Sequence, residues 1–533
     1  MKYSLFSLTA SLGLAALITV PLHAQETEAR IIRADVSDVK GPMTQMPKLC
    51  VGSGYAPLGL RADWQQHLKI VKNTCDFEYI RFHGIFHEGM GIFSGPDKKR
   101  YNWQYVDKVY DYILSIGMKP FVEISFMPNE LASNKPSEVE RTLGKTMVFN
   151  YNANVTPPKS YDDWAHLVTA FTQHLTDRYG EGEVGTWYFE CWNEANCPLF
   201  WTGDRDEYFK LYDATARAVK SVSKDYRTGG PSTAASRWVP ELIEYCEKNV
   251  TPIDFFTTHE YGIVAGMVDG DGVSKKFMKT ERDDIIRHVK KVRGQIEASK
   301  HAGAELHYTE WSASYSSRDP IHDSYHMPAY ILQKVKGVEG DASSMSYWVF
   351  SDVFEESGPG HFPFHGGFGL LNLQGLKKPS FYAYKFFNDL GDTELNCSDA
   401  DSWVTKEGDD VQVLLWNFTP VNQGEEHNRS YFTKDLPAAD VGAATIKLDN
   451  LEKGKYEMNV YKVGYRVNDV YADFRDMGSP DAPTLAQVAE LAQKNNGSSP
   501  VETLKIKVGR DGMFTKQLDL RENDVVLLTL TKK

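Results

Sequence analysis

Two glutamates stand at the ends of two apolar, aromatic stretches of the sequence. Residues 187–194 run through tryptophan, tyrosine, phenylalanine and cysteine and end at Asn193 and Glu194, and residues 306–311 form a similar stretch around Glu310. Each stretch has the continuous bulk of a strand that is covered on both faces. A carboxylate at the C-terminal end of such a strand lies where parallel barrels carry their chemistry, and two carboxylates meeting there suit the hydrolysis of a glycosidic bond.

The two carboxyl groups must differ in protonation state. Glu194 is the candidate general acid, because burial and nearby negative charge raise the pKa of a carboxyl group and keep its proton available near neutral pH. Glu310 is the candidate nucleophile and must stay ionised, so it needs hydrogen-bond donors, which His259 and Tyr261 can supply. Asn193 can offer its amide to a sugar hydroxyl. If the carboxyl groups lie about 5–5.5 Å apart, cleavage retains the anomeric configuration through a covalent intermediate.

A single glutamate at the end of a strand is more often a solvated turn residue than a catalytic group. Glu194 and Glu310 fall on the fourth and seventh strands that we count, and each is flanked by tryptophan. The presence of two such glutamates makes a catalytic pair the favoured interpretation. An alternative from another class, a carbohydrate-binding protein on an inactive barrel, stays open, and hydrolysis of an aryl glycoside distinguishes the two.

The elements that must position these residues alternate between short apolar strands and amphipathic helices. We expect strands at residues 49–52, 79–83, 119–124, 187–192, 228–231, 255–259, 306–311 and 345–350. A helical pattern follows each of them, and the alternation fills residues 49–392. It predicts a (β/α)8 TIM barrel rather than a doubly wound sheet. Long segments after strands, at 88–100, 128–159, 263–280 and 352–375, predict a deep cleft at the barrel mouth.

The pattern changes over residues 393–533. Apolar alternation at 410–416, 445–448, 456–461 and 525–530, separated by Asn, Asp and Gly turns, predicts a C-terminal β-sandwich domain. One helical insertion is expected at 485–494. Within the N-terminal segment 25–48, residues 31–36 can form a single strand. This strand could pair with the strands of the β-sandwich and complete it.

The N-terminus carries the features of a secretory signal peptide. Lys2 gives a basic start, an apolar run follows to Val20, and Ala24 precedes a polar stretch. Cleavage after Ala24 would remove residues 1–24. The apolar run is short for a membrane span, and no other stretch is long enough, so we expect a secreted or periplasmic protein with no span in the mature chain.

Composition excludes several other classes. The net charge is −13, and the sequence has no cluster of Lys and Arg for a nucleic acid backbone. No Cys-x-x-Cys spacing suggests zinc, and Pro363 separates His361 from His365, so we expect no metal. The glycines lack the phosphate-loop pattern, so we expect no nucleotide cofactor either. Cys50 and Cys191 fall within strands and are expected to be buried thiols.

Several motifs, taken in order, resemble glycoside hydrolase family 39, the β-xylosidase and α-L-iduronidase family. They are residues 81–84, 192–194 with 200–201, 259–261, 309–311, 350–356 and 365–371. The resemblance covers the barrel from about Cys50 to Leu390. One departure is Ala195, where the family usually has proline, which affects the rigidity of that turn and no catalytic group.

The resemblance implies that Glu194 is the acid/base and Glu310 the nucleophile. It also implies sugar contacts from His83, Asn193, Phe200, His259, Tyr261, Trp348 and a carboxylate of the pair Glu355 and Glu356. We therefore expect a retaining, exo-acting β-xylosidase that takes an oligosaccharide or aryl glycoside and needs no cofactor. An α-L-iduronidase-like or α-L-arabinosidase-like specificity, and an endo-acting enzyme, are the alternatives.

Overall fold

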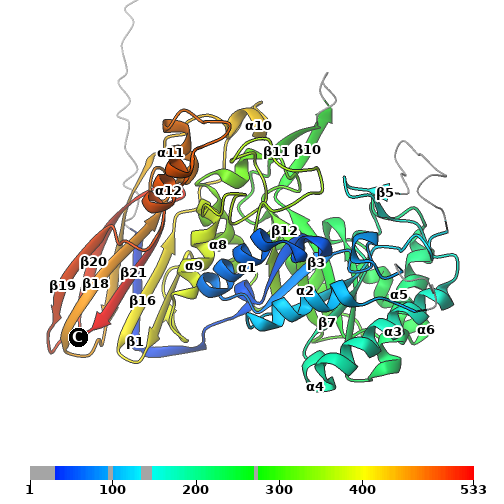
Figure 1. Ribbon diagram of the computed structural model, residues 1–533. Helices are drawn as coiled ribbons and strands as arrows, with labels where there is room; N and C mark the ends of the chain where they lie inside the picture. Colours follow the sequence, from blue (N-terminus) through cyan, green and yellow to red (C-terminus); the bar gives the residue numbers. More distant parts are fainter. Residues whose placement is uncertain (1–29, 94–99, 134–146, 269–273) are drawn as a thin grey trace, which may run out of the picture.

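The computed structural model describes residues 30–93, 100–133, 147–268 and 274–533 (Figure 1). The signal peptide expected over residues 1–24 lies outside these ranges. The described chain forms a barrel of strands and helices beside a sheet of long, tilted strands, and the C-terminus lies at the far end of that sheet.

Eight parallel strands close into the barrel. In sequence order they are β2 (Cys50–Tyr55), β3 (Tyr79–His83), β4 (Lys119–Ile124), β7 (Tyr188–Cys191), β8 (Arg227–Thr233), β9 (Phe255–Tyr261), β12 (Glu305–Ser312) and β13 (Ser344–Tyr347). Neighbours in sequence are neighbours in space, and the pair Tyr347 and Val51 closes the ring between β13 and β2. The predicted TIM barrel is confirmed.

A helix follows each barrel strand and covers its outer side. These helices are α1 (Ala62–Cys75), α2 (Gln104–Ser115), α3 (Tyr161–Tyr179), α5 (Arg205–Val222), α6 (Val239–Asn249), α7 (Asp284–Glu297), α8 (Met327–Gly337) and α9 (Pro379–Asn388). Helix α5, directly after the Glu194 loop, begins at a capping box in which Asp204 and Glu207 satisfy each other's backbone donors. A one-turn helix, α4 (Glu181–Val184), was not predicted.

Two of the long segments at the mouth contain β-hairpins that the sequence pattern does not predict. Strands β5 (Met147–Val148) and β6 (Ala153–Asn154) pair in one, and β10 (Ile263–Val268) and β11 (Ser274–Met278) pair in the other. In Figure 1 the β10–β11 hairpin stands clear of the barrel above β12. Its first strand follows β9 after Gly262, so it continues the wall of the barrel mouth.

The remaining strands form one largely antiparallel sheet of sandwich-like shape, which confirms the second domain of the predicted fold. They are β1 (Arg30–Pro42), β14 (Thr393–Cys397), β15 (Ser402–Glu407), β16 (Asp410–Trp416), β17 (Asp440–Asp449), β18 (Gly454–Val463), β19 (Glu502–Val508), β20 (Phe514–Arg521) and β21 (Val525–Lys532). Their spatial order is β19-β18-β21-β16-β15-β14-β1-β17-β20. Side chains from both halves of the sheet, such as Ile32, Val413 and Leu528, share one core.

The N-terminal strand β1 lies inside this sheet. It pairs antiparallel with β14 and parallel with β17. An ion pair between Arg30 and Asp399, 2.6 Å long, fixes its beginning. A segment from one end of the sequence thus fills a central place among strands from the other end.

Three helices interrupt the second domain, where the sequence analysis predicted one. Helix α12 (Leu485–Lys494) covers the predicted residues, but α10 (Asn428–Tyr431) and α11 (Val470–Asp476) were missed because they are short. Helices α11 and α12 share an apolar cluster with the barrel, in which Val470, Phe474 and Leu491 meet Phe364 and Leu376. The loop after β13 is therefore held by the second domain.

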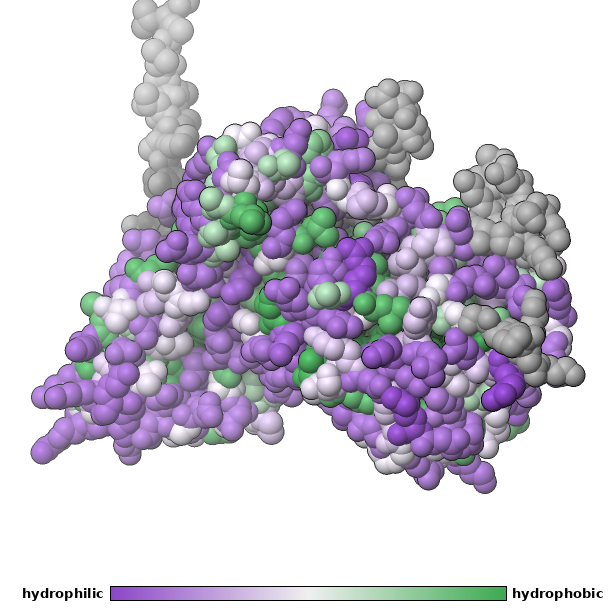
Figure 2. Space-filling model, viewed as in Figure 1, coloured by the Kyte–Doolittle hydropathy of each residue, from purple (hydrophilic) through white to green (hydrophobic). Residues whose placement is uncertain are grey.

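The face drawn in Figure 2 is mostly hydrophilic, with hydrophobic residues in small separate groups. Among the described helices, none has the length and hydropathy needed to cross a bilayer.

Strand β1 offers a matched pair of substitutions to measure its contribution to stability. Ile32 is fully buried, whereas its neighbour Ile31 is 45% exposed. We expect Ile32→Ala to lower the free energy of unfolding by about 2–4 kcal/mol, because it leaves a cavity in the core, and Ile31→Ala to change it by about 0.5 kcal/mol. Urea unfolding followed by circular dichroism measures both. Equal effects would mean that β1 does not pack as described.

Candidate active site

A cavity of about 640 Å³ opens at the C-terminal ends of the barrel strands. Of the residues predicted to bind or cleave a sugar, those that line it are His83, Asn193, Glu194, Phe200, Tyr261, Glu310, Trp348 and Glu356. They come from the ends of β3, β7, β9, β12 and β13 or from the loops that follow. The fold thus brings together residues that are up to 273 positions apart in the sequence, from His83 to Glu356.

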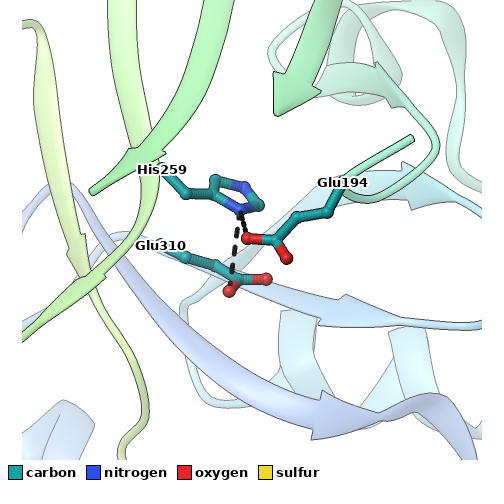
Figure 3. A group of neighbouring side chains, drawn as sticks. All are labelled: Glu194, His259 and Glu310. Atoms are coloured by element: carbon teal, nitrogen blue, oxygen red, sulfur yellow. Dashed lines mark hydrogen bonds and ion pairs between the residues drawn. The ribbon is translucent and has the colours of Figure 1, made fainter. Parts of the chain in front are cut away.

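The two candidate catalytic carboxyl groups face one another (Figure 3). One carboxyl oxygen of Glu194, one of Glu310 and a ring nitrogen of His259 all lie within 4.8 Å of one another. A separation this short leaves no room for the water that inverting enzymes place between sugar and base, since their carboxyl groups are about 6.5–9.5 Å apart. The geometry matches the retaining arrangement.

Glu194 is held on a turn directly after β7. Its backbone has a positive φ of 45°, and its N–H donates to the carbonyl of Ser232 at 2.7 Å. Burial raises the pKa of Glu194 from 4.5 to about 7, against the opposing charges of His83 and Arg81. Glu194 can therefore keep its proton at neutral pH.

His259 contacts Glu194 through Nδ1, at 2.9 Å from Oε1. Burial lowers the pKa of His259 to about 4, so the ring is neutral and only one of its nitrogens carries hydrogen. The hydroxyl of Thr309 donates to Glu190, so it can only accept from the other ring nitrogen, Nε2, which lies 3.2 Å away. These contacts assign the ring hydrogen to Nε2 and make Nδ1 an acceptor, which requires Glu194 to donate its own proton.

Glu310 is surrounded by donors instead. Arg81 donates from Nη1 to Oε1 at 2.7 Å, and Tyr261 donates from its hydroxyl to Oε2 at 2.9 Å. Nε2 of His83 lies 3.6 Å from Oε1. Both carboxyl oxygens therefore accept a hydrogen bond, and Oε1 also lies beside the charged guanidinium of Arg81.

Two details differ from the expectation. His259 was expected to support Glu310, but its Nδ1 lies 3.7 Å from Oε2 of Glu310 and 2.9 Å from Glu194, so it serves the acid instead. Of the carboxylate pair after β13, Glu356 lines the cavity, whereas Glu355 points away and forms an ion pair with Arg61. Glu356 lies in a turn, and the sequence does not reveal which of the two neighbouring side chains faces the cavity.

Arg81 belongs to one of the motifs that resemble family 39, and its role in the site was not predicted. It is fully buried, and it bonds Glu190, Glu123 and Glu310 at 2.6, 2.8 and 2.7 Å. Its Nη2 also donates to Oδ1 of Asn193 at 3.0 Å, which orients that amide. The available signal was a charged residue inside the apolar strand β3, since a buried charge must have partners.

Glu194, His259 and Glu310 together have the spacing of a metal site. Each carboxyl group, however, already has a partner in Nδ1 of His259 or in Arg81 and Tyr261. The guanidinium of Arg81 against Glu310 also repels a divalent cation. The donor set therefore fits acid–base and nucleophilic chemistry better than metal binding.

The raised pKa of Glu194 makes stability depend on pH. Because the folded pKa is about 7 against 4.5 when unfolded, the stabilisation is complete below pH 4.5 and is lost as the pH rises through 7. Glu194→Gln mimics the protonated acid and removes this dependence. We expect the variant to match the wild type at pH 4.5 and to exceed its free energy of unfolding by up to about 3 kcal/mol at pH 8, measured by urea unfolding.

Glu425 is exposed, so Glu425→Gln serves as a control for the effect of removing one carboxylate from the surface. A difference between wild type and Glu194→Gln that stays constant from pH 4.5 to 8 would contradict the assignment of the proton to Glu194.

Comparisons with known proteins identify the family of this chain. The model for glycosyl hydrolases family 39 matches residues 30–512. A beta-xylosidase of Caldicellulosiruptor saccharolyticus is 40% identical over 494 residues, which cover 90% of this chain and 94% of that protein. A beta-xylosidase of Geobacillus stearothermophilus is 34% identical over 494 residues, which cover 91% of this chain and 92% of that protein. The crystal structure of a monomeric beta-xylosidase from Caulobacter crescentus CB15 is 40% identical and has a TM-score of 0.89, covering 95% of this chain and 100% of that one. The chain belongs to glycosyl hydrolases family 39.

Proposed function

We propose that this chain is a retaining, exo-acting β-xylosidase in which Glu194 is the general acid/base and Glu310 the nucleophile. The observation that carries the proposal is that a carboxyl oxygen of Glu194 lies within 4.8 Å of one of Glu310, while the two carboxyl groups have different surroundings. Burial favours the protonated form of Glu194, and donors surround Glu310. Family relatives that are beta-xylosidases over nine-tenths of this chain support the choice of sugar.

The reaction proceeds in two displacements. Glu310 attacks the anomeric carbon while the glycosidic C–O bond breaks, and the proton of Glu194 passes to the leaving oxygen. A covalent glycosyl ester on Glu310 results. Glu194, now a carboxylate, takes a proton from water, whose oxygen attacks the anomeric carbon and releases the sugar and Glu310. His259 Nδ1, which accepts from Glu194 before the reaction, helps to hold that proton in place.

Polar groups on the β3 and β13 side of the cavity are available to bind the sugar. Although burial opposes its charge, Glu123 raises the pKa of His83 to about 10, so this imidazolium donates from both nitrogens. The Oε1 atom of Glu356 is buried and lies 3.5 Å from His83 Nε2, which is long for a hydrogen bond and leaves this oxygen available to a hydroxyl. Trp348 offers an aromatic face within the same cavity.

These charges favour a neutral pentose over a uronic acid at the position that is cleaved. The protonated His83 already faces Glu123, Glu310 and Glu356. Arg81 is likewise committed to carboxylates. A carboxylate on the sugar ring would meet negative charge here, which argues against the α-L-iduronidase-like alternative.

We also propose that the chain is exported, on the strength of the basic start, apolar run and Ala24 described above. N-terminal sequencing of the protein recovered from the periplasm or medium of a bacterial host should begin at Gln25. An intact Met1 on active protein confined to the cytoplasm would refute this.

Substitution of the two glutamates separates their roles. Glu310→Ala should lower kcat on all β-xylosides by about a thousandfold or more, because no covalent intermediate forms. Glu194→Ala should lower kcat/KM by a similar factor for methyl or disaccharide leaving groups but by less than about tenfold for 2,4-dinitrophenyl β-xyloside, whose leaving oxygen needs little protonation.

Steady-state kinetics with both classes of substrate measure these effects, and Glu355→Gln, outside the cavity, serves as the control. Equal losses of Glu194→Ala on good and poor leaving groups would refute its role as acid. Retention of activity by Glu310→Ala would refute a carbohydrate-cleaving role for that residue.

A further inference from the structure

The two catalytic glutamates divide the barrel mouth into two arcs. Going round the barrel from β12, which carries Glu310, one arc passes β13, β2, β3 and β4 before it reaches β7, which precedes Glu194. The other arc passes only β9 and β8. In the proposed function, His83, Trp348 and Glu356 bind the cleaved sugar, and all lie on the first arc. The leaving group must then face the second arc.

The second arc has an apolar and aromatic lining. The turn after β8 contributes the small side chains of Ala234 and Ala235, and Ile263 lies at the start of the β10–β11 hairpin. Tyr315 also lines the cavity, and it is 48% exposed. Its ring meets the edge of Tyr261, the residue that donates to Glu310, with centroids 6.1 Å apart. An aromatic wall therefore runs outward from the nucleophile.

Lys276 on β11 adds a positive charge to this wall. It lines the cavity, and its Nζ lies 5.4 Å from the centroid of the Tyr315 ring. Within the described chain no carboxylate lies at ion-pair distance from it. Lys279, three residues further on, is different, because it pairs with Glu260 at 3.1 Å and the carbonyl of Tyr261 at 2.8 Å. Lys276 thus lies over an aromatic ring at the mouth of the cavity, without an ion-pair partner among the residues that the structure describes.

The rest of the cavity repels anions. Glu260 and Glu310 line it, and the chain as a whole has a net charge of −13. His83 and Arg81 are engaged with carboxylates on the sugar side. An anionic leaving group would be disfavoured everywhere in this cavity except beside Lys276.

We propose that the leaving-group side of the cavity accepts an aglycone that carries a carboxylate, which pairs with Lys276 while the body of the aglycone lies on Tyr315. This inference rests on the proposed β-xylosidase function and narrows its substrate class. Two kinds of aglycone present this chemistry, an aromatic acid and a uronic acid residue. Both have a flat or apolar face for Tyr315 and a carboxylate beyond it.

Matched substrates test the charge without changing the sugar. One pair is 4-carboxyphenyl and 4-carbamoylphenyl β-xyloside, and the other is a β-xylosyl glucuronate and the corresponding β-xylosyl glucoside. For each pair, the ratio of kcat/KM for the acid to that for its neutral partner is measured in wild type and in Lys276→Gln. The intrinsic difference between leaving groups cancels when the ratio is compared between enzymes.

We expect Lys276→Gln to lower this ratio by about fivefold, as for a partly exposed ion pair worth about 1 kcal/mol, mainly through KM. Lys276→Arg should retain the ratio, and 0.5 M NaCl should reduce it in wild type but not in Lys276→Gln. Lys275→Gln is the matched control, because Lys275 is an exposed neighbour on the same strand and faces the other way. Tyr315→Ala should raise KM for both members of a pair.

The outcomes are distinct. A change in the aryl pair alone supports the inference with an aromatic acid as the ligand, and a change in the disaccharide pair identifies a uronic acid. An unchanged ratio in both pairs overturns the inference while leaving the β-xylosidase intact. Failure of the wild type to hydrolyse any β-xyloside would overturn the proposed function itself.

Discussion

A single buried guanidinium organises the catalytic end of the barrel. Arg81 has no exposed surface, and it bonds Glu123 and Glu190 from neighbouring strands as well as Glu310. Three carboxylates this close together in a buried site would repel one another strongly without a cation between them. The partners in turn raise the pKa of Arg81 and keep it charged, against the effect of burial. Glu310, the proposed nucleophile, is therefore positioned by a network whose parts come from β3, β4, β7 and β12.

The proposed chemistry needs Glu194 and Glu310 in different protonation states, although their side chains are identical. Glu310 lies at the end of this network, where Arg81 and Tyr261 donate to its two oxygens. Glu194 lies across the cavity, beyond direct reach of a donor of comparable strength, beside a neutral His259. Two glutamates less than 5 Å apart thus have opposite surroundings, which suit the proposed roles of nucleophile and acid.

The sequence was sufficient for the barrel, the second domain and the two glutamates. Barrel strands are buried on both sides and therefore appear as continuous apolar runs, and a glutamate that ends such a run stands out. The hairpin of β10 and β11 was harder to predict, because β11 begins with Ser-Lys-Lys and lacks the continuous apolar run of a barrel strand. The sequence could not show that His259 contacts Glu194, or that Glu356 rather than Glu355 faces the cavity. Both depend on how a loop turns, and no local sequence pattern encodes that. The network around Arg81 joins residues more than two hundred positions apart, such as Arg81 and Glu310, so it became visible only in three dimensions.

The contact between the two domains has a consequence for how this architecture can change. The loop after β13 carries Glu356, and further along the same loop Phe364 and Leu376 pack against Val470, Phe474 and Leu491 of α11 and α12. The strand β1 ties the start of the chain into the same sheet. A barrel without the second domain would lose the packing that supports this loop. The second domain therefore helps to shape the cavity, although the cavity itself is lined by residues of the barrel.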